Sequence, residues 1–386
     1  MTGMTGMTGM TGMTGMGTYA GFNPVTTSAL ITTRDGIAGS WEKICGNPNP
    51  LKGDDPENME LWSPQVRALV IETELLSHLA ITAHTSAGKI QEAASFVSYL
   101  RWVEHDDCKI PCILPHPFIE LTRPRMEEFE KQLDLVANYA DLRADRAAEI
   151  IDQLGYPTGF FTSVMGLQPD RNSYTLELIA ACQSFASSVV IRVKHALACK
   201  RPDAFSAQIQ PIIQTPGHGA LPSGHATEAF CAARVLQLLA ADAEKKDKGC
   251  EDKVTYTVPH KLNEMLMRLA ARIAVNRTVA GVHFPADSIA GAALGLALGE
   301  YFVGRAHLDA LPSKTVKSVR FNGPEVGATD FHTLDLIKGK EFNERDNLGD
   351  IVKIDSASGL GNLELVSSEE SKPLNWLWKE ARGEWK

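Results

Sequence analysis

From about residue 63 onward, apolar residues recur at steps of three and four, the spacing that places them on one face of an amphipathic helix. The first such segment is expected to bury Val66 and Leu69. The clearest one carries Met126, Phe129 and Leu133 on one face and charged residues opposite. Alternation of apolar and polar residues, typical of strands, is scarce before residue 310. The pattern predicts an all-α fold with helices from about Ser63 and over residues 87–104, 124–153, 172–199, 224–244, 259–275 and 286–304.

The N-terminal segment departs from this pattern. Residues 1–15 are five copies of Met-Thr-Gly, which lack the apolar mass needed to offset the entropy of ordering. The segment after them is rich in Gly, Pro, Asn and Thr, which predicts an extended arm that packs on the body. We divide the chain into a disordered repeat at 1–16, an extended arm at 17–60, one helical domain at 61–311 and an irregular C-terminal tail at 312–386.

In the C-terminal tail, Gly, Asn and Asp separate short apolar runs, which predicts loops and a hairpin. Trp376, Trp378 and Trp385 lie close together on a last short helix. A helix with three large aromatic side chains is expected to pack on the body of the protein or on a partner subunit. We expect a homo-oligomer, either a dimer or a larger assembly.

The composition limits the class of protein. A hydrophobic fraction of 44% and a charged fraction of 22% are those of a globular protein with a sizeable core. A formal net charge of −9 argues against a nucleic-acid partner and requires any anion site to be built locally. The longest apolar runs, 178–191 and 288–299, fall short of the ~20 residues that cross a bilayer. Without a visible secretory signal, we expect a soluble protein with no membrane partner, and the cytoplasm is slightly favoured.

Seven cysteines are scattered along the chain, without the spacing of a disulfide framework. Cys108 and Cys112 follow His105, but a structural zinc site needs a second pair of ligands at a defined spacing, and none is evident. We therefore expect free buried thiols and a reducing compartment.

Three short blocks supply three cations, a hydroxyl, two imidazoles, a carboxylate and a turn with free backbone N–H groups. A tetrahedral oxyanion requires such a set, because cations neutralise it while N–H and O–H groups donate to its oxygens. One imidazole can bond the central atom while another handles a proton. The blocks are Lys194 with Arg201-Pro202, then Pro222-Ser223-Gly224-His225, then Arg277 with His283 and Asp287.

Each block alone also has a plainer interpretation. Lys194 and Arg201 on one helix face are more often a solvated stripe, and Ser223 suits the N-cap of the helix that follows it. His283 beside a helix start is more often structural. Because the three blocks occur together, with mostly apolar helices between them, they favour one oxyanion site.

The series Lys-x6-Arg-Pro, Pro-Ser-Gly-His and Arg-x5-His-x3-Asp resembles the signature shared by type 2 phosphatidic acid phosphatases, bacterial non-specific acid phosphatases and vanadium-dependent haloperoxidases. The resemblance covers about residues 172–304, the motif core of the helical domain. One departure is Asn276, where the family usually has serine; we treat that position as peripheral. The resemblance implies an all-α fold whose helical bundles hold the oxyanion at their centre.

The same resemblance implies a role for each matching residue. His283 is the ligand of vanadium, or the nucleophile that forms a phosphohistidine, and Asp287 orients it. Ser223 and the Gly224 N–H donate to the oxyanion, and His225 serves as acid and base. The equatorial oxygens are neutralised by Lys194, Arg201 and Arg277.

Within this superfamily, the sequence favours the haloperoxidases. Membrane lipid phosphatases need spans that we do not find, and the soluble acid phosphatases are much shorter. His218, five residues before Ser223, resembles the histidine of algal bromoperoxidases, where fungal chloroperoxidases carry an aromatic residue; a plain turn histidine is the alternative. The resemblance thus implies a bromoperoxidase with vanadate as cofactor. Hydrogen peroxide, a halide (bromide or iodide) and a small organic acceptor would be its partners, and a hypohalous species its product.

Two other functions stay open from the sequence. One is a soluble acid phosphatase that uses the same pocket without a metal and acts through His283. The other is a non-catalytic protein that binds an oxyanion or supports an assembly, which the full set of catalytic residue types disfavours.

Overall fold

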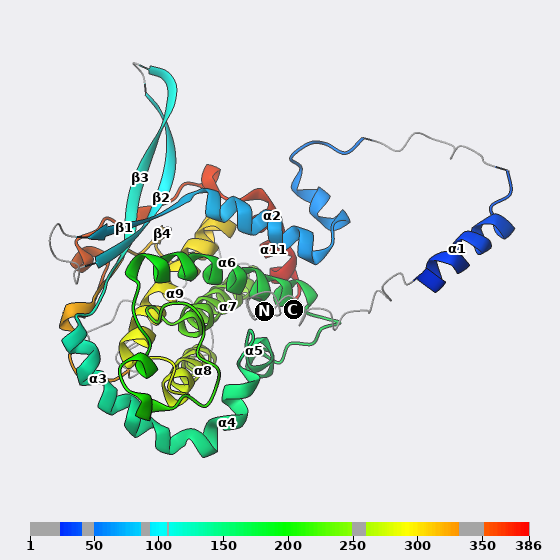
Figure 1. Ribbon diagram of the computed structural model, residues 1–386. Coiled ribbons are helices and arrows are strands. Elements are labelled where there is room, and N and C mark those ends of the chain that lie inside the picture. Colours follow the sequence, from blue (N-terminus) through cyan, green and yellow to red (C-terminus); the bar gives the residue numbers. More distant parts are fainter. Residues whose placement is uncertain are drawn as a thin grey trace.

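The computed structural model describes residues 24–40, 50–85, 93–105, 108–248, 260–331 and 351–385. They form a mostly helical body with a sheet on one side of it (Figure 1). The expected disorder of residues 1–16 lies outside the described residues. The helices are α1 (Pro24–Ile37), α2 (Pro64–Ser77), α3 (Met126–Tyr139), α4 (Arg143–Asp152), α5 (Thr158–Met165), α6 (Ser173–Leu197), α7 (Gly224–Lys248), α8 (His260–Val279), α9 (Pro285–Ala306) and α11 (Lys372–Gly383). The strands are β1 (Leu79–Thr85), β2 (Ala93–His105), β3 (Cys108–Thr122), β4 (Thr315–Val316), β5 (Val319–Asn322), β6 (Val352–Ile354) and β7 (Leu363–Glu364).

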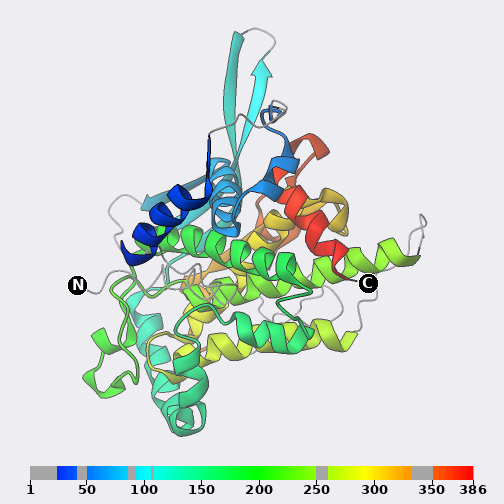
Figure 2. The ribbon, with the colours of Figure 1, turned by 90° about the vertical axis from the view of Figure 1, so that its right-hand side faces the viewer.

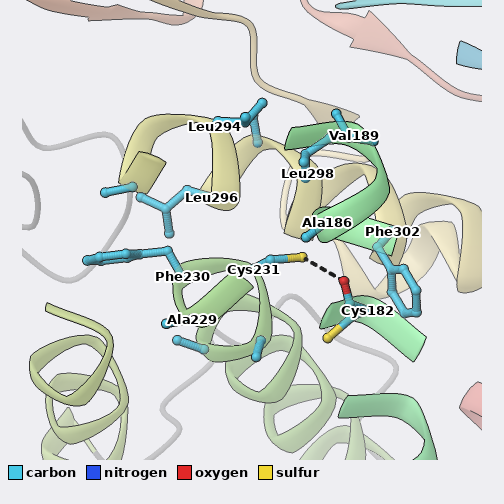
Figure 3. Close-up of a cluster of buried hydrophobic side chains, with 14 of the residues drawn as sticks. Cys182, Ala186, Val189, Ala229, Phe230, Cys231, Leu294, Leu296, Leu298 and Phe302 are labelled. Atoms are coloured by element: carbon cyan, nitrogen blue, oxygen red, sulfur yellow. Dashed lines mark hydrogen bonds between the residues drawn. The ribbon is translucent and has the colours of Figure 1, made fainter. Parts of the chain in front are cut away.

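Helix α7 is the centre of the bundle, because it packs against α6, α8 and α9. In Figure 2, α6, α7 and α8 run across the view one above another. The predicted ranges of these helices agree with the observed ones to within a few residues. Their shared interface is apolar and fully buried. Figure 3 shows part of it: Cys182, Ala186 and Val189 from α6, Ala229, Phe230 and Cys231 from α7, and Leu294, Leu298 and Phe302 from α9.

Two glycines set the separation of α9 from α7. A Cβ added at Gly291 would stand 2.7 Å from the Ser223 carbonyl oxygen, and one at Gly295 would overlap the Thr227 carbonyl. Only glycine permits so close an approach of one backbone to another. The Ser223 N–H consequently donates to the Asp287 carbonyl oxygen at 2.8 Å, which joins the second and third motif blocks.

The all-α prediction is wrong for residues 79–122, which form strands in the part of the chain that the structure describes. Strands β1, β2 and β3 are antiparallel neighbours in a five-stranded sheet of order β1-β2-β3-β5-β6. The helix predicted at 87–104 is therefore wrong, because Ala93–His105 is β2. A short apolar run such as Phe96 to Leu100 fits either period. Pairing with β1 and β3 on both sides decides it, and that pairing is not visible in local sequence.

The same strands form the most prominent feature of the outline. Beyond the sheet, β2 and β3 continue as a long hairpin that stands away from the helices (Figure 1). Trp102 and Ile113 face each other in its register, and both are exposed.

The C-terminal tail contains more regular structure than we predicted. Strand β5 pairs in parallel with β3, with Ile119 opposite Val319, and β6 pairs antiparallel with β5. Strands β4 and β7 form a second, two-stranded sheet. On α11, Trp376 and Trp378 are buried against the body. The tail therefore extends the sheet of the N-terminal half and also covers the bundle.

The N-terminal arm and the third predicted helix also differ from expectation. The arm predicted at 17–60 is not extended at 24–37, because those residues form α1, which Pro24 begins. Its described side chains are exposed, so this part of the arm does not pack on the body. The helix predicted at 124–153 is two helices, α3 and α4, separated by a 3₁₀ turn at Ala140–Leu142.

On α2 the sequence pattern selected the wrong face. Val66 and Leu69 are exposed, whereas Arg67, Ile71 and Leu75 are buried. Arg67 lies on the buried face because it pairs with Glu177 of α6. A charged residue that finds its partner on another helix cannot be recognised by a count of apolar positions.

Two helical segments, Ser173–Ala204 and Pro285–Ala306, are long and apolar enough to cross a membrane by length and composition. The expectation that no such segment exists is therefore wrong. All of the second segment and 61% of the window in the first are buried inside the protein. The core helix of a globular protein meets the same test, so these segments are weak evidence for a membrane.

Three of the described cysteines are buried free thiols, at positions 182, 199 and 231. Cys112 is exposed, which contradicts the prediction of buried thiols for that position. The side chain of Cys108 lies outside the described residues.

Candidate active site

The three sequence blocks meet where four helix ends come together. Lys194 is in the last turn of α6 and Arg277 is in the last turn of α8. Ser223 directly precedes α7, and Asp287 is in the first turn of α9. The helices begin and end there for local reasons: Ala198 adopts a left-handed conformation (φ 50°) that closes α6, and Pro285 opens α9. The site residues that the sequence predicted and that are buried are Lys194, Arg201, Ser223, Arg277, His283 and Asp287.

Lys194 is held by two carbonyl groups of the loop before α7. Its Nζ donates to the oxygens of Gly219 at 3.0 Å and Ala220 at 2.7 Å. Since an ammonium group has three protons, one stays available for a bound oxyanion. Burial, together with the nearby Arg201, lowers the pKa of Lys194 to about 7.

Arg201 connects the first block to the third. Its Nη1 donates to the Val282 carbonyl oxygen at 2.7 Å and lies 3.1 Å from Nε2 of His283. Its Nε donates to the His218 carbonyl oxygen at 3.2 Å. Burial lowers the pKa of Arg201 to about 10, so the guanidinium remains charged at neutral pH.

Arg277 has two nitrogen atoms, carrying three N–H bonds, without a hydrogen-bond partner among the described residues. Its Nη2 donates to the Ile150 carbonyl oxygen and to Gln153 Oε1, both at 3.2 Å. Its Nε and Nη1 are buried and make no hydrogen bond. A buried donor without an acceptor costs about 1–3 kcal/mol, more when it is charged. These two atoms suit an oxyanion, which supplies the missing acceptors, so the residues present fit vanadate or phosphate.

Ser223 and Gly224 both lie at the start of α7. The Ser223 hydroxyl oxygen accepts from the Ala226 N–H at 3.4 Å, so Ser223 caps the helix as the plainer interpretation proposed. A Cβ at Gly224 would have Glu228 Oε1 at 3.7 Å and Lys194 Cε at 3.9 Å, which is ordinary contact. Gly224 is therefore not required by steric exclusion of a Cβ within the protein. Its small size leaves room for a ligand beside Lys194.

The hydrogen bonds of His283 define its tautomer. Its Nδ1 lies 2.9 Å from Asp287 Oδ2, which also accepts from the Phe284 N–H at 3.0 Å. Because the carboxylate accepts, Nδ1 carries the proton and Nε2 presents a lone pair, which accepts from Arg201 Nη1 at 3.1 Å. Burial, with Arg201 and Lys194 nearby, lowers the pKa of His283 far below its usual value. Burial also raises the pKa of Asp287 to about 7. Nε2 of His283 can therefore bond vanadium or phosphorus.

His225 has the opposite tautomer to His283. Its Nε2 lies 2.7 Å from the Gln153 carbonyl oxygen, which can only accept, so Nε2 carries the proton. Nδ1 then presents a lone pair. Burial, and the charge of Arg277, lower the pKa of His225 to about 3. This imidazole is therefore neutral at neutral pH in the free protein.

His218 lies at the edge of the site and is partly exposed. Its Nδ1 lies 3.2 Å from Arg201 Nη2, which can only donate, and 3.1 Å from the Gly219 carbonyl oxygen, which can only accept. Burial of the ring, together with Lys194, lowers the pKa of His218 to about 4. The structure therefore places a third neutral imidazole beside Arg201.

Two buried residues of the site were missed by sequence reasoning. Gln153, at the end of α4, bonds both His225 and Arg277, yet no motif contains it. Glu228, one turn into α7, lies beside Gly224, and burial raises its pKa to about 7. An acidic residue in the first turns of an apolar helix was the available signal for Glu228.

Asn276, treated as peripheral from the sequence, is fully buried and bonds three side chains of α4 and its end. Its Oδ1 accepts from Arg146, and its Nδ2 donates to Glu149 and Gln153. The peripheral assignment was therefore wrong. Serine is too short to reach these partners.

Among the described residues, no group of three or more His, Cys, Asp or Glu side chains is arranged to hold a metal ion. Vanadate bound through one histidine and a ring of cations does not require such a cluster, because its oxygens carry the charge.

Comparison with known proteins agrees with the motif core. Residues 175–305, about a third of the chain, match the family model described as the PAP2 superfamily. The matched region contains all three blocks and excludes α4. No curated protein matches the chain. The match supports placing the helical region that carries the site in the PAP2 superfamily, whose members are hydrolytic or haloperoxidase enzymes.

Proposed function

We propose that this protein is a vanadate-dependent haloperoxidase that oxidises bromide or iodide with hydrogen peroxide. The observation that carries the proposal is Arg277, whose buried Nε and Nη1 have no acceptor among the described residues. Together with Lys194 and Arg201 it forms a set of three cations that a tetrahedral oxyanion would neutralise. The superfamily match supports this type of enzyme in general and does not separate oxidation from phosphate ester hydrolysis.

The proposed ligand of vanadate is His283 through Nε2, since Asp287 occupies Nδ1. Lys194, Arg201, Arg277 and the Ser223 and Gly224 donors would hold the oxyanion. Bound vanadate supplies a Lewis acid that activates hydrogen peroxide. The buried position of these side chains keeps bulk water away from the reacting atoms.

His225 is the residue we propose to move the proton. Its Nδ1 lone pair can take a proton from hydrogen peroxide when that molecule enters the site. A neutral base suits this step. The first step of phosphate ester hydrolysis instead needs an acid for the leaving group. A pKa of about 3 leaves His225 unprotonated at neutral pH and also makes it a weak base, so this pKa does not separate the two candidates.

His218 is the residue we propose to influence the halide step. It is partly exposed beside Arg201, where an incoming halide would meet a neutral imidazole. We therefore propose bromide and iodide over chloride. The alternative, a structural histidine in the turn, predicts no change in halide preference or pH optimum when His218 is replaced by alanine.

The second candidate is a soluble acid phosphatase that uses the same pocket. The arrangement of His283 and Asp287 supports it, because Nε2 has the lone pair that an attack on phosphorus needs. In this case the product of the first step is a phosphohistidine at His283.

One pair of assays separates the two candidates. The protein is dialysed against chelator and divided in two. One half receives orthovanadate, hydrogen peroxide, bromide and a phenolic dye; the other receives p-nitrophenyl phosphate without vanadate. We expect dye bromination that depends on vanadate. Phosphate ester turnover without bromination at any vanadate level would contradict the proposal and select the phosphatase.

Two variants test the assigned roles. His283→Ala should abolish vanadate retention, because it removes the only proposed protein bond to the metal. His225→Ala should retain binding and lose most of the turnover, about a hundredfold or more. Equal loss of binding in both variants would contradict the division of roles.

The remaining properties are proposals from the sequence. We propose a soluble, cytoplasmic homo-oligomer, with a small organic molecule as the acceptor of the hypohalous species. Gel filtration with light scattering tests the oligomer, and fractionation of cells tests the location.

A further inference from the structure

The end of α4 touches the candidate active site through Ile150 and through Gln153, which directly follows the helix. Gln153 follows Asp152, the last residue of α4, and its N–H donates to the Glu149 carbonyl oxygen at 2.9 Å. Its side chain is fully buried. This position lies outside the segment that matches the PAP2 superfamily, residues 175–305.

Gln153 bonds two functional side chains through different atoms. Its backbone carbonyl accepts from His225 Nε2 at 2.7 Å, and its side-chain Oε1 accepts from Arg277 Nη2 at 3.2 Å. The same Oε1 accepts from Asn276 Nδ2 at 3.0 Å. One residue therefore restrains an imidazole of α7 and a guanidinium of α8.

A polar network fixes Gln153 in turn. Asn276 also donates to Glu149, and Glu149 pairs with Arg272 of α8. Arg146 donates to Asn276 from one turn earlier on α4. These contacts bind the end of α4 to the last turns of α8, so the Gln153 carbonyl and amide have little freedom to move.

We infer that Gln153 is a positioning residue that keeps His225 in its Nε2–H tautomer and directs the Arg277 guanidinium toward the bound oxyanion. This rests on the oxyanion site proposed above, and it holds equally for a peroxidase and for a phosphatase. The side-chain Nε2 of Gln153 is buried without a partner among the described residues, so it adds a further polar group beside Arg277.

The physical reason is the number of acceptors available to Arg277. Without the Gln153 amide oxygen, Nη2 retains only the Ile150 carbonyl, and the guanidinium can rotate away from the oxyanion. The end of α4 also loses its bond to Asn276, so the carbonyl that orients His225 becomes free to shift. Loss of the Gln153 amide should therefore weaken oxyanion binding and also change the tautomer of His225.

The test measures oxyanion binding without any turnover. Tungstate is a suitable probe, because this tetrahedral dianion does not titrate near neutral pH and is not a substrate. Calorimetric titration compares the full-length wild type, Gln153→Met and the control Gln183→Met. Gln183 is also fully buried, its Oε1 accepts from Thr158 at 3.2 Å, and its Nε2 has no partner among the described residues.

We expect Gln153→Met to bind tungstate about tenfold more weakly than wild type, while Gln183→Met binds normally. A second readout is the NMR signal of the His225 ring nitrogens in protein with isotope-labelled histidine. The wild type should show a single tautomer protonated at Nε2. Gln153→Met should show a mixture.

The outcomes separate the two levels of the proposal. If Gln153→Met matches Gln183→Met in tungstate affinity and in the His225 signal, the role of Gln153 is refuted, although the oxyanion site stands. If the wild type does not bind tungstate, the site itself is wrong. Should Gln153→Met fail to fold, Gln153→Asn keeps the amide and shortens its reach, and it should weaken binding in the same direction.

Discussion

The protein buries charged side chains in two regions, which differ in how completely the protein satisfies their hydrogen bonds. Between α2 and α6, Arg67 bonds Glu177 through two nitrogens, at 2.7 and 2.5 Å. Its remaining group, Nη1, donates to the Met59 and Trp62 carbonyl oxygens. In the candidate active site, Arg277 leaves Nε and Nη1 without acceptors among the described residues.

The difference separates groups that stabilise the fold from groups that await a ligand. Desolvation of an ion is repaid only when its partners satisfy it within the protein. The Arg67–Glu177 pair meets that condition. Arg277 meets it in part, and the pKa of about 7 for both Lys194 and Glu228 shows the cost of burial at the same site. The comparison predicts that substitutions in the two regions affect different properties.

The largest effect on stability is expected from Arg67→Met. The substitution leaves Glu177 buried without its cation, which should lower the free energy of unfolding by about 3–5 kcal/mol. Urea unfolding measures this loss, and tungstate affinity should stay at the wild-type value. The double variant Arg67→Met/Glu177→Leu should recover most of the stability. A single variant that loses less than about 1 kcal/mol would show that this pair is no better satisfied than the active site.

Arg277→Met should have the converse effect. It removes a cation from the proposed oxyanion site, so tungstate affinity should fall about a hundredfold, which corresponds to about 3 kcal/mol. The free energy of unfolding without ligand should not decrease, because the variant no longer buries two guanidinium nitrogens that have no partner among the described residues. Calorimetry and urea unfolding on one preparation check both results. A clear loss of stability would mean that Arg277 is satisfied by the protein after all.

Glu228→Gln tests the comparison between the two regions through the pH dependence of the free energy of unfolding. Burial raises the pKa of Glu228 to about 7 from its ordinary 4.5, so the folded protein holds a proton that the unfolded chain loses in that interval. Glu228 should therefore contribute a decline of about 3 kcal/mol to the stability of the wild type as pH rises from about 4.5 to about 7, beside the separate contributions of Asp287 and the site histidines. Glu228→Gln should remove this contribution, so its stability relative to wild type should rise over that interval, and the variant should be more stable than wild type at pH about 8.

The charged groups around Glu228 define the control for this measurement. Lys194 of α6 is near it, the Ser187 hydroxyl donates to it, and its charge raises the pKa of Tyr156. Burial raises the pKa of Glu177 as well, although its hydrogen bond to Arg67 opposes that shift. Glu177→Gln, which removes the ion pair with Arg67, should still be destabilised at pH about 8. If both glutamine variants move in the same direction, the distinction between paired and unpaired carboxylates does not hold.

The sequence predicts well those elements that local information determines. The four core helices have regular apolar spacing, and Pro285 marks the start of α9. The prediction that Lys194 and Arg201 lie on one helix face is wrong, because α6 ends at Leu197 and Arg201 lies beyond it in an extended conformation. The three blocks come together because each lies within a turn or a short loop of a helix end. These relations are readable along the chain.

Other parts depend on contacts between distant residues and could not be read in this way. The β2 strand carries apolar residues that fit either period, and only its pairing with β1 and β3 selects a strand. Arg67 occupies the buried face of α2 because it pairs with Glu177. That partner lies 110 positions away in the sequence, so the pairing could not be predicted from the local pattern. Gln153 belongs to no sequence motif and could not be recognised from the sequence, because its proposed role comes from the packing of α4 against α8.

Trp378→Phe should produce the smallest effect, and it extends the comparison to the tail. Trp378 is fully buried, and its Nε1 donates to Asp242 Oδ2 at 3.0 Å. Phenylalanine retains most of the apolar contact and removes that donor, so the loss should be about 1 kcal/mol. Asp242 keeps its ion pair with Arg382 at 3.1 Å, which limits the cost. Urea unfolding measures the loss, and tungstate affinity should not change. A loss as large as that of Arg67→Met would mean that Asp242 depends on Trp378 more than on Arg382, so an ion pair in the tail would not compensate for a missing hydrogen bond.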